Sequence, residues 1–208
     1  MIINYFGKQF FKIGLGDLTV AFNPISKDSK SGAKVSRFGS DIALSTINHS
    51  DYNGFDMVSH GETTPFEIKG PGNYEIKDIF IKGIMTEATL DKKKYINTIY
   101  TLSIDNISIC FMGVINKNNM KTDVIEEIES PDILFIPIGN DELLTPAEAY
   151  KLAVKLEPKI IIPMDYDDKT LKIFLKEGCQ ENTKPVDKLT LKPKDLIGLE
   201  GEIMVLSA

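Results

Sequence analysis

Tryptophan is absent from this chain of 208 residues, and histidine and cysteine occur only twice each. The two cysteines, Cys110 and Cys179, lie far apart and form no CxxC motif, so no disulfide framework is expected. Cys110 stands in the apolar run Ile-Ser-Ile-Cys-Phe-Met, which predicts a small buried thiol. The two histidines, His49 and His60, are too few to build an imidazole-rich zinc centre for two metal ions. We expect His60, in a Ser-His-Gly-Glu loop, to be exposed.

Long apolar runs are lacking as well. The chain contains no stretch of about 18 uncharged apolar residues, the length that a membrane-spanning helix needs. Residues 1–11 have neither a basic segment followed by a sustained apolar one nor a site resembling a signal-peptide cleavage point. We therefore expect no membrane span and predict a cytoplasmic protein.

An excess of positive charge is also missing, since 24 lysines and arginines face 30 aspartates and glutamates for a net charge of −6. Phosphate binding needs a positive face, so the composition argues against a nucleic-acid partner. The basic candidates are Lys27, Lys30 and Lys34 in one loop and Lys92–Lys94 in another. Both groups are short and turn-like, and we interpret them as solvated loops.

The residues that are present predict a layered α+β protein with a single domain over residues 1–208. The front half is rich in strands, and the last third alternates apolar strands with helices. The clearest helix is 145–156, where Thr145 as N-cap, Pro146 in the first turn and Glu148 form a capping box. A second helix is expected over 169–178, after the apolar strand at 159–165.

Six segments, in order along nearly the whole chain, together resemble the metallo-β-lactamase superfamily. They are most similar to a bacterial branch of zinc-dependent hydrolases related to lactonases. The segments are GKQFFKI, AFNP, DIALSTINHSDYNG, IKGPGNYEI, INTIYTLSIDNISICFMGVI and DILFIPIG through PMDY. The resemblance implies a four-layer αββα sandwich, with two β-sheets face to face, helices outside, and one or two metal ions held in loops at one edge. It also suggests a bacterial source.

Part of the family's metal site is kept. Where the family has Thr-His-x-His-x-Asp-His, this chain reads Thr-Ile-Asn-His-Ser-Asp-Tyr over residues 46–52. The resemblance implies that His49 serves the first metal and that Asp51 and Asp165 serve the second. Such a split set favours either no cofactor or one weakly bound divalent ion, zinc, manganese or magnesium.

The other ligand positions carry different side chains. The resemblance places Ile47 and Tyr52 at two histidine positions and Val114 at that of the carboxylate shared by both metals. Lys8 stands where the branch has a histidine, and Asn23 where it has an aspartate. A further histidine expected after the strand ending in Gly-Ile-Met is missing.

Each retained residue also has an ordinary structural interpretation. His49 and Asp51 could be turn residues, with Asp51 capping backbone N–H groups. Asp165 could be a helix N-cap instead of a ligand, and Tyr52 either a packed side chain or a phenol acid in a reused pocket. Because a carboxylate without its metal needs a cation, we predict that Lys8 pairs with Asp51 or Asp165.

Two functions follow, with a third less supported. The first is a non-catalytic pseudo-hydrolase that keeps the fold for binding, assembly or regulation, with an unknown protein or small molecule as partner. The second is a hydrolase of a small ester, lactone or phosphoester with a single metal ion, in which Asp51 or Asp165 is ligand or general base. The third, nucleic-acid processing, would need a basic groove near Lys27–Lys34. Exposed strand edges leave a homodimer open.

Overall fold

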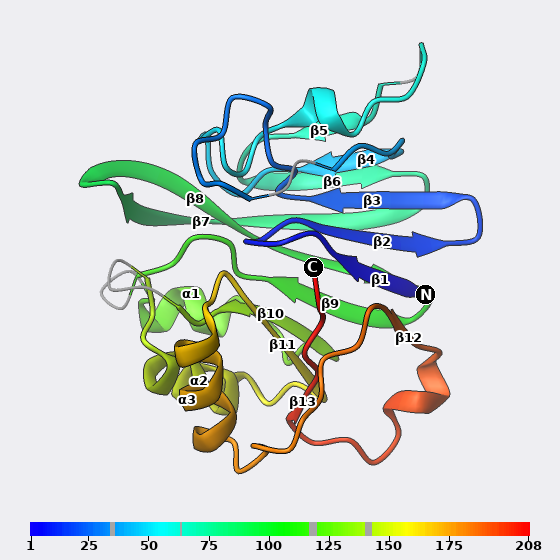
Figure 1. Ribbon diagram of the computed structural model, residues 1–208. Coiled ribbons are helices and arrows are strands. Elements are labelled where there is room, and N and C mark those ends of the chain that lie inside the picture. The colour runs from blue at the N-terminus through cyan, green and yellow to red at the C-terminus, as the bar shows by residue number, and fades with distance from the viewer. Residues whose placement is uncertain (34–35, 63, 117–119, 140–142) are drawn as a thin grey trace.

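Two β-sheets packed face to face form the centre of the protein (Figure 1). The computed structural model describes residues 1–33, 36–62, 64–116, 120–139 and 143–208. The six-stranded sheet has the strand order β12-β1-β2-β3-β4-β5. Its strands are β1 (Ile2–Tyr5), β2 (Phe11–Leu15), β3 (Leu18–Phe22), β4 (Ile42–Leu44), β5 (Phe66–Ile68) and β12 (Leu189–Thr190).

The seven-stranded sheet has the order β13-β11-β10-β9-β8-β7-β6. Its strands are β6 (Gly72–Ile76), β7 (Ile79–Leu90), β8 (Lys93–Ile104), β9 (Ile107–Phe111), β10 (Ile133–Pro137), β11 (Ile160–Met164) and β13 (Glu202–Ile203). β6 to β9 pair antiparallel, whereas β9, β10, β11 and β13 pair parallel. β10 and β11 are buried throughout, as parallel strands covered on both faces are, which explains their unbroken apolar sequences.

Aromatic rings join the two sheets in the core. Phe22 of one sheet stacks on Phe111 of the other with ring centroids 4.7 Å apart, and Phe11 meets Phe135 edge-on at 4.8 Å. All four rings are fully buried. Cys110 is buried as predicted, and His60 is exposed as predicted.

Helices cover the outer face of the seven-stranded sheet (Figure 1). They are α1 (Thr122–Glu126), α2 (Pro146–Leu156) and α3 (Asp168–Glu177). On the outer face of the other sheet, the described residues form the short 3₁₀ helix η1 (Phe55–Met57) and loops, whose apolar side chains pack on Phe10 and Ala43. The layered α+β sandwich is thus confirmed, with one outer layer reduced to a 3₁₀ turn and loops. A further 3₁₀ helix, η3 (Pro193–Leu196), lies between β12 and β13.

The helix starts test two predictions. The capping box of α2 is present as expected, with Thr145 and Glu148 exchanging hydrogen bonds. The N-cap of α3 is Asp167, whose carboxylate accepts from the Thr170 N–H at 2.8 Å. Asp165 lies two residues before this cap, so the alternative that it caps the helix is wrong. In the described ranges, no helix combines the length and the apolar character that a membrane crossing requires.

Candidate site at the sheet edge

Three chain segments distant in sequence meet at one edge of the sandwich. They are the β1–β2 turn with Lys8 and Gln9, the loop that follows β4, and Asp165 directly after β11. The Asp165 backbone N–H donates to the Lys8 carbonyl at 2.7 Å and so joins the two sheets. Lys8 and Asp165 both have left-handed backbone angles, with φ of 51° and 54°, which turn each segment sharply at the strand end.

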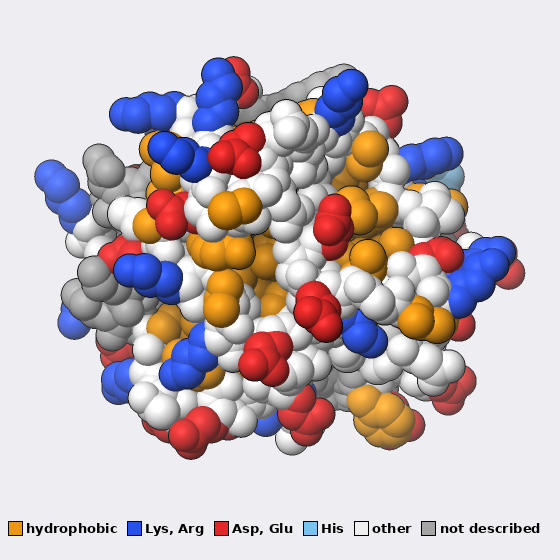
Figure 2. Space-filling view, turned by 90° about the horizontal axis from the view of Figure 1, so that it is seen from below, with side chains coloured by type: hydrophobic (Ala, Val, Ile, Leu, Met, Phe, Trp, Pro, Cys, Tyr) orange, Lys and Arg blue, Asp and Glu red, His pale blue; other side chains and the backbone are white. Residues whose placement is uncertain are grey.

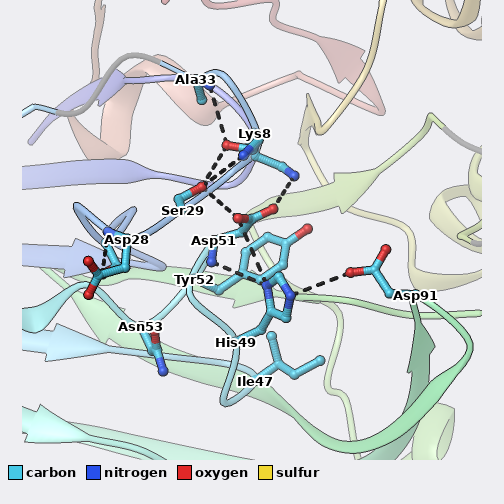
Figure 3. A network of polar contacts seen from close by, with 12 residues as sticks. Lys8, Asp28, Ser29, Ala33, Ile47, His49, Asp51, Tyr52, Asn53 and Asp91 are labelled. Atoms are coloured by element: carbon cyan, nitrogen blue, oxygen red, sulfur yellow. Dashed lines mark hydrogen bonds and ion pairs between the residues drawn. The ribbon is translucent and has the colours of Figure 1, made fainter.

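Asp51 is neutralised by a lysine. The Lys8 ammonium lies 2.7 Å from Asp51 Oδ2, and the Ser29 hydroxyl donates to Oδ1 at 2.6 Å (Figure 3). Burial alone would raise the pKa of the Asp51 carboxyl, but the hydrogen bonds from Lys8 and Ser29 outweigh it and hold this pKa below its ordinary value. Of the two ion pairs predicted for Lys8, the structure contains the one with Asp51.

Asp165 is held by neutral donors. Its Oδ2 accepts from the Tyr52 hydroxyl at 3.0 Å and from the Gln9 amide at 3.2 Å. Burial raises the pKa of Asp165, although the nearby charge of Lys8 and these two hydrogen bonds act in the opposite direction. Burial and the charge of Asp165 also raise the pKa of the Tyr52 phenol well above its ordinary value. Tyr52 is therefore far from the pKa that a general acid needs near neutral pH.

Both ring nitrogens of His49 face other groups. Its Nδ1 accepts from the Asp51 backbone N–H at 3.2 Å, and its Nε2 lies 3.5 Å from a carboxylate oxygen of Asp91. Asp91 stands in the β7–β8 turn, which brings the tip of that hairpin over the site (Figure 3). The Tyr95 ring packs edge-on against the imidazole at 6.0 Å. His49 and Asp51 do stand in a turn, which the hydrogen bond from the Tyr52 N–H to the His49 carbonyl closes at 2.9 Å. The Asp51 carboxylate, however, accepts from the Lys8 and Ser29 side chains, so the expectation that it caps backbone N–H groups is wrong.

Asn23 joins the site to the strand ends beneath it. It is fully buried and has a left-handed φ of 47°, a conformation that asparagine tolerates better than most residues. Its amide donates to Gln9 Oε1 and to Thr46 Oγ1, both at 3.0 Å, and its oxygen accepts from the Thr46 N–H at 2.8 Å. An amide at this position donates to the Gln9 oxygen and accepts from the Thr46 N–H, whereas an ionised carboxylate could not donate to the Gln9 oxygen.

Apolar side chains fill the remaining ligand positions. Ile47, Tyr52 and Val114 belong to one buried cluster, which they form with Ala88, Leu90 and Leu143. Ile47, Tyr52 and Val114 are each at most 2% exposed. The positions at which the resemblance expects two histidines and a bridging carboxylate thus form a packed contact between the site loop and the β7–β8 hairpin.

The residues at this edge do not fit a metal ion in the arrangement observed. Within the described parts of the chain, no three histidine, cysteine, aspartate or glutamate side chains are grouped so that they could hold one. The carboxylates of Asp51 and Asp165 point toward hydrogen-bond donors and not toward one shared position. The positive charge of the Lys8 ammonium would also repel a metal ion bound to Asp51. Asp51 and Asp165 are brought to one edge, but with separate partners.

Sequence reasoning missed three residues that shape this site. Gln9 was available beside Lys8 in the N-terminal hairpin, and a buried amide partner could have been sought there. Ser29 is one of several serines in a polar loop, and Asp91 stands in an ordinary hairpin turn. Nothing in the local pattern distinguishes Ser29 or Asp91, because their roles depend on how distant loops meet.

Comparison with known proteins identifies the relatives of this chain. A family model described as the β-lactamase superfamily domain matches residues 2–165. A UPF0173 metal-dependent hydrolase from Staphylothermus marinus is 28% identical in an alignment of 222 positions, gaps included, that covers 92% of this chain and 96% of that protein. A UPF0173 metal-dependent hydrolase from Listeria welshimeri is 25% identical, over 80% of this chain and 86% of its own length.

Solved structures give the same answer for the fold. A Thermotoga maritima protein named as a Zn-dependent hydrolase of the metallo-β-lactamase superfamily superposes with a TM-score of 0.77 and 25% identity, covering 99% of this chain and 97% of its own. A protein from Parabacteroides distasonis superposes with a TM-score of 0.68 at 15% identity, over 99% of this chain and 93% of that one, and supports the fold alone. This chain therefore belongs to the β-lactamase superfamily and has the metallo-β-lactamase fold.

Proposed function

We propose that this protein is a non-catalytic member of its superfamily, in which Lys8 supplies the positive charge that a metal ion supplies in its relatives. The observation that carries the proposal is the 2.7 Å ion pair between Lys8 and Asp51. A lysine in that place satisfies a partly buried carboxylate permanently, without a cofactor. The retained fold then serves a binding or structural role toward a protein or small molecule.

The apolar cluster supports the same proposal from a second direction. Ile47, Tyr52 and Val114 come from separate parts of the chain, yet they pack into one cluster. A single altered ligand could tune a metal site, whereas three apolar or aromatic replacements that pack together stabilise the loops without a metal. Packing of these side chains would thus hold the loops together, as metal coordination does in a hydrolase of this fold.

The second candidate is a hydrolase with one divalent ion, and it has two observations in its favour. The relatives are named metal-dependent hydrolases, and His49 Nδ1 lies 4.0 Å from Asp51 Oδ1. Movement of the Lys8 side chain would free Asp51 to bind an ion beside His49. The substrate would then be a small ester, lactone or phosphoester.

Cytoplasmic location, a bacterial source and a single domain over 1–208 stay predictions.

Metal content and thermal stability distinguish the two candidates. Elemental analysis of untagged, chelator-free protein is expected to find substoichiometric zinc, manganese and iron, and added Zn²⁺, Mn²⁺ or Mg²⁺ is expected to leave the melting temperature unchanged. Lys8→Ala is the informative variant, because it exposes Asp51 and should allow an ion to raise the melting temperature. Near-stoichiometric metal in the wild type that His49→Ala loses would overturn the proposal and favour the hydrolase.

A further inference from the structure

A groove on the helical side of the protein is lined by both apolar and polar groups and left open. It lies between the C-terminal end of α2, the end of α3 and residues 198–201, and encloses about 780 Å³. Tyr150, Val154, Pro158 and Leu199 supply its apolar surface, and Val154 is 56% exposed. Seen from below, hydrophobic side chains gather in the middle of this face with acidic side chains among them (Figure 2).

The charge at the groove is negative. Glu157 and Glu200 line it and are exposed, and among the described residues neither forms an ion pair. The lysine of the groove, Lys159, is already held by Asp132 at 2.6 Å. Two free carboxylates beside apolar surface favour an occupant that presents apolar side chains next to positive charge.

The β7–β8 hairpin of this same chain has that chemistry. In the sheet register, Glu87 lies opposite Ile96 and Met85 opposite Thr98, so Met85 and Ile96 share one face of the hairpin. Met85 is 60% exposed and Ile96 59%, whereas methionine and isoleucine side chains are usually buried. The hairpin projects beyond the neighbouring strands at the left of Figure 1, away from the helices.

Positive charge stands beside these two apolar residues. Lys92, Lys93 and Lys94 form the turn and the start of β8, all are exposed, and within the described chain none forms an ion pair. The opposite face of the hairpin is occupied, because Leu90 and Tyr95 pack on the candidate site. Lys94 lies on the same face as Met85 and Ile96, and Lys92 stands in the turn, whereas Lys93 lies opposite Leu90 on the occupied face. The exposed face also carries Glu87, which lies opposite Ile96.

We propose that the groove of one copy of this protein receives the β7–β8 hairpin of a second copy. Ile96 and Met85 would contact the groove's apolar side chains, and the hairpin lysines would approach Glu157 and Glu200. Since groove and hairpin are different surfaces, the contact is head-to-tail, and its repetition gives a ring or an open chain. The proposal stands independently of whether the candidate site binds a metal.

Two point variants test the contact through mixing. Ile96→Asp damages the hairpin and leaves the groove intact, whereas Val154→Asp does the reverse; both positions are more than half exposed, so folding should be retained, as circular dichroism would check. In sedimentation velocity, the wild type is expected to associate with rising concentration and less so at high salt. Each variant alone should associate about tenfold more weakly or worse.

The mixture gives the decisive result. An equimolar mixture of the two variants has one intact contact per pair, so it should form a 1:1 dimer and stop there. Phe66→Asp is the matched control, because Phe66 is 52% exposed on β5, outside both surfaces, and should associate like the wild type. A wild type that stays monomeric at every attainable concentration would overturn the proposal. Association unaffected by either variant, or a mixture that stays monomeric, would overturn it as well.

Discussion

The carboxylates at the two ends of the parallel strands β10 and β11 have different kinds of hydrogen-bond partner. At the amino ends, Asp132 accepts from the Ser108 N–H at 2.8 Å, from the Ser108 hydroxyl at 3.0 Å and from the Lys159 ammonium at 2.6 Å. At the carboxyl ends, Asp165 accepts from the tyrosine and glutamine of two distant loops, and Lys8 neutralises Asp51 instead.

The difference lies in where the partners come from. Ser108 lies in β9 and Lys159 directly precedes β11; these strands are the immediate neighbours of β10, so the sheet itself brings both residues to Asp132. Lys8 and Asp51 are 43 residues apart, and Gln9 and Asp165 are 156 apart. The amino end is therefore tied locally within one sheet, whereas the carboxyl end is complete only when loops from both sheets have closed over it.

The largest effect is expected at Asn23, which holds those loops. Asn23→Ala removes three hydrogen bonds, leaves the buried Thr46 N–H without its acceptor and puts alanine at φ 47°. We expect the free energy of unfolding to fall by about 3–4 kcal/mol, as measured by urea denaturation. Asn106→Ala is the control, because Asn106 has a φ of 56° in an exposed turn, and it should lose only about 1–2 kcal/mol. Equal losses would show that backbone conformation alone explains the effect.

The next effect concerns the cation of the site. Lys8→Met leaves Asp51 partly buried without its positive partner, and we expect a loss of about 2 kcal/mol in the free energy of unfolding. Lys77→Met breaks the pair between the β6–β7 turn and Asp41, which directly precedes β4; because the Lys77 side chain is 58% exposed, solvent screens the charges, and the loss should be less than about 1 kcal/mol.

A double variant sharpens the same comparison. Replacing both partners, Lys8→Met with Asp51→Leu, removes the stranded carboxylate and extends the neighbouring apolar cluster, so stability should recover part of the loss. A double variant less stable than Lys8→Met would mean that the Ser29 hydrogen bond to Asp51 matters more than the ion pair. Calorimetry on the four proteins of this cycle would measure the coupling.

The sequence predicts the strands and helices better than the site because their signals are local. The unbroken apolar runs of β10 and β11 and the Thr145 cap of α2 each follow from a few neighbouring residues. The Lys8–Asp51 pair was predictable as one of two alternatives from charge reasoning after the resemblance had placed both residues. The Tyr52 and Gln9 hydrogen bonds to Asp165 were not predictable, because they depend on side-chain directions set by packing between loops.

The smallest effect is expected at the amino end, where it depends on pH. Burial would raise the pKa of Asp132, but the hydrogen bonds from Lys159 and Ser108 hold it below the ordinary value. A lowered folded-state pKa stabilises the protein above the unfolded-state pKa, near 4, and this stabilisation disappears as pH falls through the folded-state value.

Asp132→Asn should therefore cost about 1 kcal/mol at pH 7, since Lys159 is 47% exposed and its pair is partly screened. The difference from the wild type should shrink as the pH is lowered below about 4. Urea denaturation of both proteins across this range would measure it. A constant difference down to the lowest pH at which the protein folds would mean that the carboxylate charge contributes nothing. The neutral hydrogen bonds to Ser108 would then be what ties β9 to β10 at this end.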